Sequence, residues 1–184
     1  FRRVLFRSGM GLNESVNHGS FKAIFVTGGP GSGKDVVIRE CVGLDPIELN
    51  HVQAFNYLAE KQALATKSND ARKEAIRKRN PLVINGPADE IEKFSYVKEE
   101  LESLGYRTMM IFVETTNEIS QERNNKLSRM MVESIRQEKW NQAQSNKIHY
   151  LNSFENFLSF DNSSNVDELE EEITNTYQMI ENFL

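Results

Sequence analysis

The chain has 184 residues, of which 39% are hydrophobic and 27% are charged, and its formal net charge is −5. This balance is typical of one globular domain, and the acidic total argues against general binding of nucleic acid. No apolar run approaches the roughly 20 residues that span a bilayer, which argues against a membrane protein. The single cysteine, Cys41, excludes an intrachain disulfide. We therefore expect a protein of the reducing cytoplasm.

Residues 1–20 precede the first recognisable element, and we expect them to be disordered. Within them, FRRVLFRS at residues 1–8 back-translates to the end of a common sequencing adapter. We interpret residues 1–8 as an artefact, with Met10 as a candidate for the true start; a genuine basic arm is the alternative. The remaining residues, 21–184, are predicted to form a single domain.

Strands and helices alternate along that domain. FKAIFVT at residues 21–27 is an apolar, β-rich run, which predicts a first strand, and a helix is expected from about residue 33 to 42. The next expected elements, in chain order, are a strand at 46–49, helices at 51–65 and 69–80, a strand at 81–86, a helix at 88–105, a strand at 106–116, a polar helical region at about 117–149, a strand and loop at 156–165, and a helix at 166–183. This alternation predicts an α/β fold with a mostly parallel sheet covered on both faces.

The stretch GGPGSGK at residues 28–34 fits the pattern G-x-x-x-x-G-K. In this pattern glycines let backbone N–H groups converge on phosphate oxygens at a helix N-terminus, and the lysine reaches the β- and γ-phosphates. A chance turn is the alternative, and the strand before and helix after the stretch argue against it. The predicted nucleotide-binding residues are Gly28, Gly29, Pro30, Gly31, Ser32, Gly33, Lys34, Asp35 and Val36.

Several stretches carry a resemblance to known enzymes. IFVTGGPGSGKD, residues 24–35, resembles the nucleotide loop of adenylate kinase-like small-molecule kinases. PLVINGPA, MIFVETTNEISQERN and FDNS resemble, in that order, pieces of the zeta-toxin-like branch of P-loop kinases. The whole is also similar to kinase-like proteins of marine tailed phages, which implies the cytoplasm of a bacterium or of a phage-infected host cell.

The resemblance implies a P-loop NTPase three-layer sandwich with an inserted helical lobe at about 50–80 and a helical lid at about 117–149. It implies ATP and Mg²⁺ as cofactors and a small-molecule phosphate acceptor as partner. Arg123 and Arg129 would be lid arginines that act with Lys34 in catalysis, and Asn162 would lie beside the base of the nucleotide. Acceptor-binding candidates are Asn50, His51, Arg72, Arg77 and Asn85. For the arginines, a solvated helix face is the alternative.

Two expected carboxylates are missing. Asn85 stands where such kinases often have an acid that helps to hold Mg²⁺, and Asn50 and His51 stand where an aspartate often faces the acceptor. Conversely, Asp35 occupies the position after the lysine, where Ser or Thr is usual. Our hypothesis is that Asp35 supplies the anionic contact to Mg²⁺ that Asn85 cannot supply. The alternative is that Asp35 caps the first helical turn.

Two functions from different classes fit these residues. The first is an ATP-dependent kinase that transfers the γ-phosphoryl group to a nucleotide monophosphate, a sugar nucleotide or a similar acceptor. The alternative is a non-kinase ATP-binding module or a partner-regulated ATPase, and the missing carboxylates at Asn50 and Asn85 favour it. A GTPase is disfavoured because the guanine-reading N-K-x-D motif is absent.

Overall fold

The computed structural model describes residues 21–42, 54–56, 73, 76–77, 81–163 and 166–184. Several sequence-based expectations therefore lie outside the described residues. They are the segment 1–20, the strand at 46–49, and the candidate site residues Asn50, His51 and Arg72.

Five strands form one parallel sheet in the order β2-β3-β1-β4-β5. The strands are β1 (Phe21–Gly28), β2 (Ala54–Asn56), β3 (Leu82–Pro87), β4 (Tyr106–Glu114) and β5 (Asn156–Asp161). β1 lies in the centre, where Val26 pairs with Asn85 of β3 and with Ile111 of β4. The chain that leaves β1 at Gly28 therefore emerges at the middle of the carboxyl edge of the sheet, which is where ligands bind in open α/β folds.

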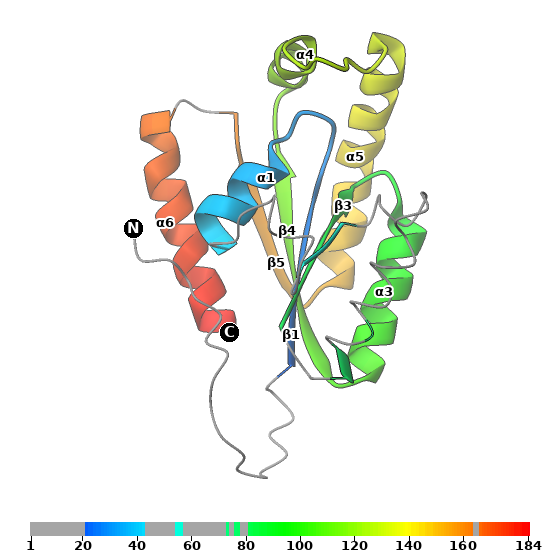
Figure 1. The fold of residues 1–184 in the computed structure, drawn as a ribbon, viewed down its shortest axis with the longest axis vertical. Helices are drawn as coiled ribbons and strands as arrows, with labels where there is room; N and C mark the ends of the chain where they lie inside the picture. The colour runs from blue at the N-terminus through cyan, green and yellow to red at the C-terminus, as the bar shows by residue number, and fades with distance from the viewer. Residues whose placement is uncertain (1–20, 43–53, 57–72, 74–75, 78–80, 164–165) are drawn as a thin grey trace.

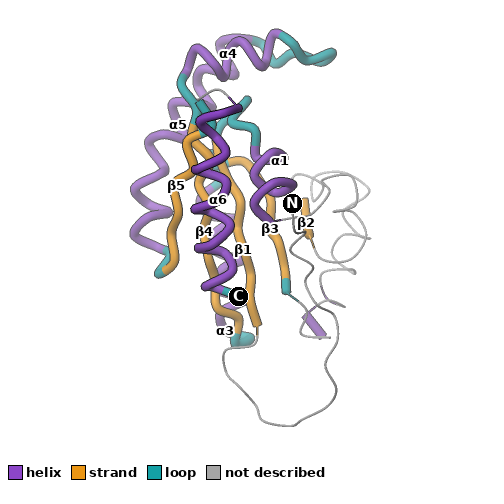
Figure 2. The backbone as a smooth tube through the Cα atoms, turned by 90° about the vertical axis from the view of Figure 1, so that its left-hand side faces the viewer, coloured by secondary structure: helices purple, strands orange, loops and turns teal. Residues whose placement is uncertain are grey.

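Helices cover both faces of the sheet, as Figures 1 and 2 show. The alternation of side chains along β1 explains the two layers, because Ala23 and Phe25 join one core cluster while Ile24 and Val26 join the other. The first cluster packs under α3 (Ile91–Ser103) and α5 (Glu133–Ser153). The second packs under α1 (Lys34–Val37), the π-helical turn η1 (Ile38–Val42) and α6 (Val166–Phe183).

One further helix, α4 (Asn117–Asn125), lies above the carboxyl ends of the strands (Figure 1). It begins directly after β4, where the side chain of Thr116 accepts a hydrogen bond from the Ile119 N–H and caps the first turn. This position brings α4 over the loop that follows β1. None of the helices in the described part of the chain is long and apolar enough to cross a membrane.

The α/β fold with a parallel sheet between two helical layers confirms the fold class expected from the sequence. One element prediction is wrong in part. The helix expected at 51–65 is contradicted at residues 54–56, which pair with β3 as a strand, because the open edge of β3 outweighs the local helical spacing. The polar helical region expected at about 117–149 consists of two helices, α4 and α5, separated at residues 126–132, where Asn124 makes two hydrogen bonds to the backbone of Met131.

Candidate phosphate-binding site

The loop of residues 28–34, called the phosphate loop below, connects β1 to α1. Gly31 and Gly33 have φ values of 68° and 79°, in the left-handed region that favours glycine. A Cβ atom on Gly31 would lie 2.8 Å from the Ser120 carbonyl oxygen, and one on Gly33 would lie 2.2 Å from Asn162 Nδ2. Both glycines are therefore required by backbone conformation and by close approach of neighbouring elements.

Three side chains hold three consecutive carbonyl oxygens of the phosphate loop, and we call Ser120, Arg123 and Asn162 the carbonyl clamp. Ser120 Oγ donates to the Pro30 oxygen at 2.6 Å. Arg123 Nη1 donates to the Gly31 oxygen at 3.0 Å and to the Ser32 oxygen at 3.3 Å. Asn162 Nδ2 also donates to the Ser32 oxygen, at 2.7 Å. Two members of the clamp also bond to each other: Arg123 Nη2 donates to the Asn162 carbonyl oxygen at 2.7 Å.

The carbonyl clamp fixes the direction of the loop amides. In a trans peptide the C=O and N–H bonds point in opposite directions, so each carbonyl turned toward α4 turns the next N–H away from it. The Ser32 N–H closes a turn with the Gly29 oxygen at 3.2 Å. The N–H groups of Gly31 and Gly33 make no hydrogen bond within the described residues, which leaves them for an anionic ligand.

Lys34 begins α1, and its Nζ donates to the Gly28 oxygen at 3.3 Å. Burial lowers the pKa of Lys34 from its usual value, and the nearby negative charges of Asp35 and Asp89 oppose this shift. A desolvated ammonium that bonds a carbonyl and forms no salt bridge with the described carboxylates gains from a phosphate, because the ligand supplies a direct counter-charge. Lys34 therefore has the position and the electrostatic surroundings of a phosphate-binding lysine.

Asp35 is exposed in the first turn of α1, and its carboxylate makes no hydrogen bond or salt bridge to the described residues. Asp35 makes no capping hydrogen bond, but its charge lies in the first turn of α1, where a negative charge is favourable, so the capping alternative also stays open. On the neighbouring strand β3, Asn85 is 9% exposed and its buried Oδ1 atom has no hydrogen-bond partner. Both groups are oxygen donors of the kind that Mg²⁺ accepts together with water and phosphate. The described residues contain no group of three or more acidic, His or Cys side chains able to hold a metal.

The arginines near the candidate site or proposed for it occupy different surroundings. Arg123 is half-buried in the carbonyl clamp, and burial lowers its pKa. Arg129 lies on the connection between α4 and α5, where it is exposed and makes no hydrogen bond or salt bridge to described residues. Arg136 is fully buried under α4, and Arg77 is helical and exposed.

Other residues adjoin the site. Asp89, which follows β3, forms a 2.5 Å ion pair with Lys139 of α5. Trp140 of α5 donates from Nε1 to the Thr115 oxygen at 3.1 Å. It also adjoins the phosphate loop, because a Cβ atom on Gly29 would lie 3.4 Å from Trp140 Cδ1. Ser120 carries no sequence signal beyond its spacing of three residues before Arg123.

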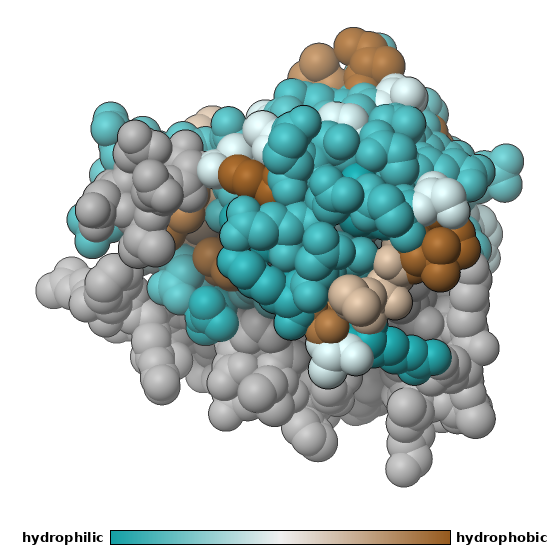
Figure 3. Space-filling view, turned by 90° about the horizontal axis from the view of Figure 1, so that it is seen from above, coloured by the Kyte–Doolittle hydropathy of each residue, from teal (hydrophilic) through white to brown (hydrophobic). Residues whose placement is uncertain are grey.

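The surface around the site is polar. Seen from above, over the carboxyl ends of the strands, the described residues that face the viewer are mainly hydrophilic, with hydrophobic side chains in small separate groups (Figure 3). Three strongly exposed apolar residues belong to the α4–α5 connection, namely Leu127, Met130 and Val132. A polar face suits a charged, hydrated ligand more than an apolar one.

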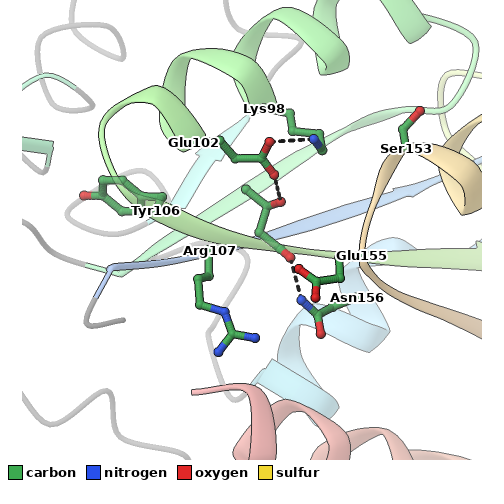
Figure 4. A pocket seen from close by; sticks show the side chains of 8 residues that line it. Lys98, Glu102, Tyr106, Arg107, Ser153, Glu155 and Asn156 are labelled. Atoms are coloured by element: carbon green, nitrogen blue, oxygen red, sulfur yellow. Dashed lines mark hydrogen bonds and ion pairs between the residues drawn. The ribbon is translucent and has the colours of Figure 1, made fainter. Parts of the chain in front are cut away.

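A second hollow, of about 340 Å³, lies at the opposite edge of the sheet and is shown in Figure 4. Its polar groups bond to one another: Lys98 pairs with Glu102 at 2.6 Å, and Glu102 accepts from Thr108 Oγ1. Arg107, which also lines it, pairs in register with Lys22, six residues before Gly28. Six strand residues span about 20 Å, so this hollow is remote from the phosphate loop.

Comparison with known proteins supports the fold. No protein-family model matches the sequence, and no curated protein sequence matches it. Among solved structures, a shikimate kinase from Bacteroides thetaiotaomicron aligns with a TM-score of 0.53 and 13% identity over 87% of this chain and 98% of that chain. Kti12 from Chaetomium thermophilum, in complex with ADP-AlF3, aligns with a TM-score of 0.51 and 14% identity over 86% and 98%. A sugar kinase from Janibacter sp. HTCC2649 aligns with a TM-score of 0.50 and 13% identity over 88% and 95%. The chain therefore has the fold of P-loop kinases.

The close approach of Asn162 to Gly33 generates a prediction for the Gly33→Ala variant. Its left-handed φ costs about 1–2 kcal/mol for any residue with a Cβ atom. Displacement of Asn162 adds the loss of its hydrogen bond to Ser32, about 1 kcal/mol. Gly105→Ala is the matched control, because Gly105 has a φ of 90° but its Cβ atom would meet nothing nearer than 3.6 Å. Chemical denaturation should show a larger loss of unfolding free energy for Gly33→Ala; equal losses would contradict the contact.

Proposed function

We propose that the protein binds ATP with Mg²⁺ and transfers the γ-phosphoryl group to a small-molecule acceptor. The proposal rests on the geometry of the phosphate loop. There the carbonyl clamp leaves the Gly31 and Gly33 N–H groups beside Lys34 without a hydrogen bond to the described residues. Such amides at a helix start are a binding site for phosphate oxygens. The kinase fold of the chain agrees with this assignment.

In the proposed reaction, the bond between the γ-phosphorus and the bridging oxygen of ATP breaks. A bond forms between that phosphorus and an acceptor oxygen, ADP leaves, and the acceptor releases a proton. Catalysis of this transfer consists mainly of positioning and of stabilising charge on the phosphoryl oxygens. Lys34 supplies one fixed cation, and Arg129 is a second cation without a competing partner among the described residues. Arg123 orients the phosphate loop, and Asn162 lies beside that loop.

Mg²⁺ would neutralise charge on the β- and γ-phosphates when bound. We assign Asp35 as the carboxylate that faces it, directly or through water, because this exposed group has no hydrogen bond or salt bridge to described residues. Asn85 is assigned to the same water shell through its unpartnered Oδ1 atom. Repulsion between Asp35 and the phosphates is offset by the metal and by Lys34.

We further propose a nucleotide monophosphate, a sugar nucleotide or a similar acceptor, with Asn50, His51, Arg72 and Arg77 as its candidate contacts. The competing function is an ATP-binding module or partner-regulated ATPase that has no small-molecule acceptor. Asn50 and Asn85, which stand where such kinases often carry carboxylate side chains, favour that alternative. Acceptor-dependent turnover separates the two functions.

ADP production from Mg·ATP should be measured with and without a panel of nucleoside monophosphates, sugars and sugar nucleotides. We expect one acceptor class to stimulate turnover, and Lys34→Met to reduce the stimulated rate by about 100-fold or more. Lys98→Met is the matched control, because Lys98 lies in the remote hollow. Nucleotide binding without stimulation by any acceptor would favour the ATP-binding module. Equal activity of Lys34→Met and Lys98→Met would refute the assigned role of the loop.

Asp35→Asn tests the metal assignment. We expect the concentration of Mg²⁺ needed for tight ADP binding to rise about tenfold, because the variant removes a full negative charge from a hard-cation site. Calorimetric titration of ADP at graded Mg²⁺ concentrations measures this without turnover. Glu40→Gln, on the following turn, is the control for loss of one negative charge. If Asp35→Asn and Glu40→Gln show the same Mg²⁺ dependence as the unmodified protein, Asp35 does not face the metal.

A further inference from the structure

Arg136 is a buried charge that the proposed reaction does not use. Its side chain is 0% exposed, yet it lies at the start of α5, one turn below the exposed α4–α5 connection. The guanidinium bonds Glu133 twice, from Nε at 2.9 Å and from Nη2 at 2.7 Å. This pair neutralises the buried charge, and the same hydrogen bonding lowers the pKa of Glu133.

Other N–H groups of Arg136 bond to side chains of α4, and Nη2 also lies 2.8 Å from Gln137 Oε1 on α5 itself. Nη2 donates to Asn117 Oδ1 at 2.7 Å, at the first residue of α4. Nη1 donates to Ser120 Oγ at 2.8 Å, one turn further along the same helix. Arg136 therefore joins the start of α5 to α4 through two side chains of α4.

Ser120 forms hydrogen bonds with both Arg136 and the phosphate loop, and its single hydroxyl proton determines which group donates in each of them. A guanidinium can only donate, so the hydroxyl oxygen must accept from Arg136. The single hydroxyl proton is then available to the Pro30 carbonyl oxygen, 2.6 Å away. Each hydrogen bond polarises the next, which makes the second stronger than it would be alone. The donor-to-acceptor direction therefore runs from Arg136 through Ser120 to Pro30, while Glu133 accepts from other N–H groups of the same guanidinium and completes a linked chain of four residues.

We propose that Ser120 is a positioning residue that couples the start of α5, through Arg136, to the orientation of the phosphate loop. The Pro30 carbonyl belongs to the same peptide as the Gly31 N–H, so the hydrogen bond from Ser120 aims that amide at the ligand. Nucleotide affinity thus depends on the packing of α5 against α4, although neither Ser120 nor Arg136 contacts the nucleotide. This inference rests on the proposed function for its ligand, but the coupling itself exists in the ligand-free protein.

Ser120→Ala tests the coupling with two measurements. In the ligand-free protein, amide hydrogen exchange of Ser32, whose N–H closes the loop turn, should become about tenfold faster, because the hydrogen bond from Ser120 to the Pro30 carbonyl is lost together with the one from Arg136 to Ser120. The dissociation constant of ADP with Mg²⁺ should rise by about the same factor. Ser145→Ala is the matched control, since Ser145 is an exposed serine of α5 that donates only to the Asn141 carbonyl.

The two measurements separate this inference from the proposed function. If the unmodified protein does not bind ADP, the proposed function fails, and Ser32 exchange alone decides the coupling. Unchanged Ser32 exchange in Ser120→Ala would overturn the coupling whatever the ADP result. Faster Ser32 exchange with unchanged ADP affinity would also overturn it, because the loop would then not depend on Ser120 for binding.

Glu133→Gln tests the Glu133 end of this chain of hydrogen bonds without removing the buried Arg136. Glu133 is 46% exposed at its side chain, so the substitution leaves the core intact. We expect Glu133→Gln to speed Ser32 exchange in the unmodified background and to have no further effect in Ser120→Ala, because the chain is already broken there. Independent, additive effects of the two substitutions would contradict a single chain.

Discussion

The direction of three carbonyl groups is the constraint on which the site depends. Pro30, Gly31 and Ser32 turn their oxygens toward α4 and the end of β5, where these oxygens accept hydrogen bonds from the side chains of the carbonyl clamp. The parallel order of the sheet provides those partners, because β1 is flanked by β4, and both α4 and the loop after β5 start from the same carboxyl edge. The free amides of the loop are thus a consequence of sheet topology rather than of the loop sequence alone.

The positive charges of the site are divided between two tasks. Arg123 and Arg136 donate their hydrogen bonds to carbonyl, hydroxyl, amide and carboxylate oxygens of the protein, and through these bonds they support the loop. Lys34 is held by a single carbonyl of the loop at 3.3 Å and remains close to its negative neighbours. A ligand with phosphate groups would therefore find Lys34 available, while the supporting arginines stay in place. Preorganised dipoles and charges of this kind stabilise a transferring phosphoryl group without reorganisation.

The amino-acid sequence predicts local features of this protein but not the contacts between segments that are distant in the chain. The phosphate loop is readable because its glycines and Lys34 are adjacent in sequence, and the final helix at 166–183 is readable from its amphipathic pattern. The break between α4 and α5 at residues 126–132 has no signal in the sequence, since this segment contains neither Gly nor Pro. The role of Ser120 is hidden because its partner Pro30 is 90 residues away. Arg136 resembles a surface arginine until the packing of α5 on α4 is known.

The most direct measurement follows the Gly31 and Gly33 amides by NMR during titration with ADP and Mg²⁺. We expect saturable downfield shifts of both amide protons, because each gains a charge-assisted hydrogen bond to phosphate. Adenosine, which has no phosphate, should leave both resonances in place. Shifts confined to residues outside the phosphate loop, or equal shifts with adenosine, would contradict the claim that these amides bind the phosphates.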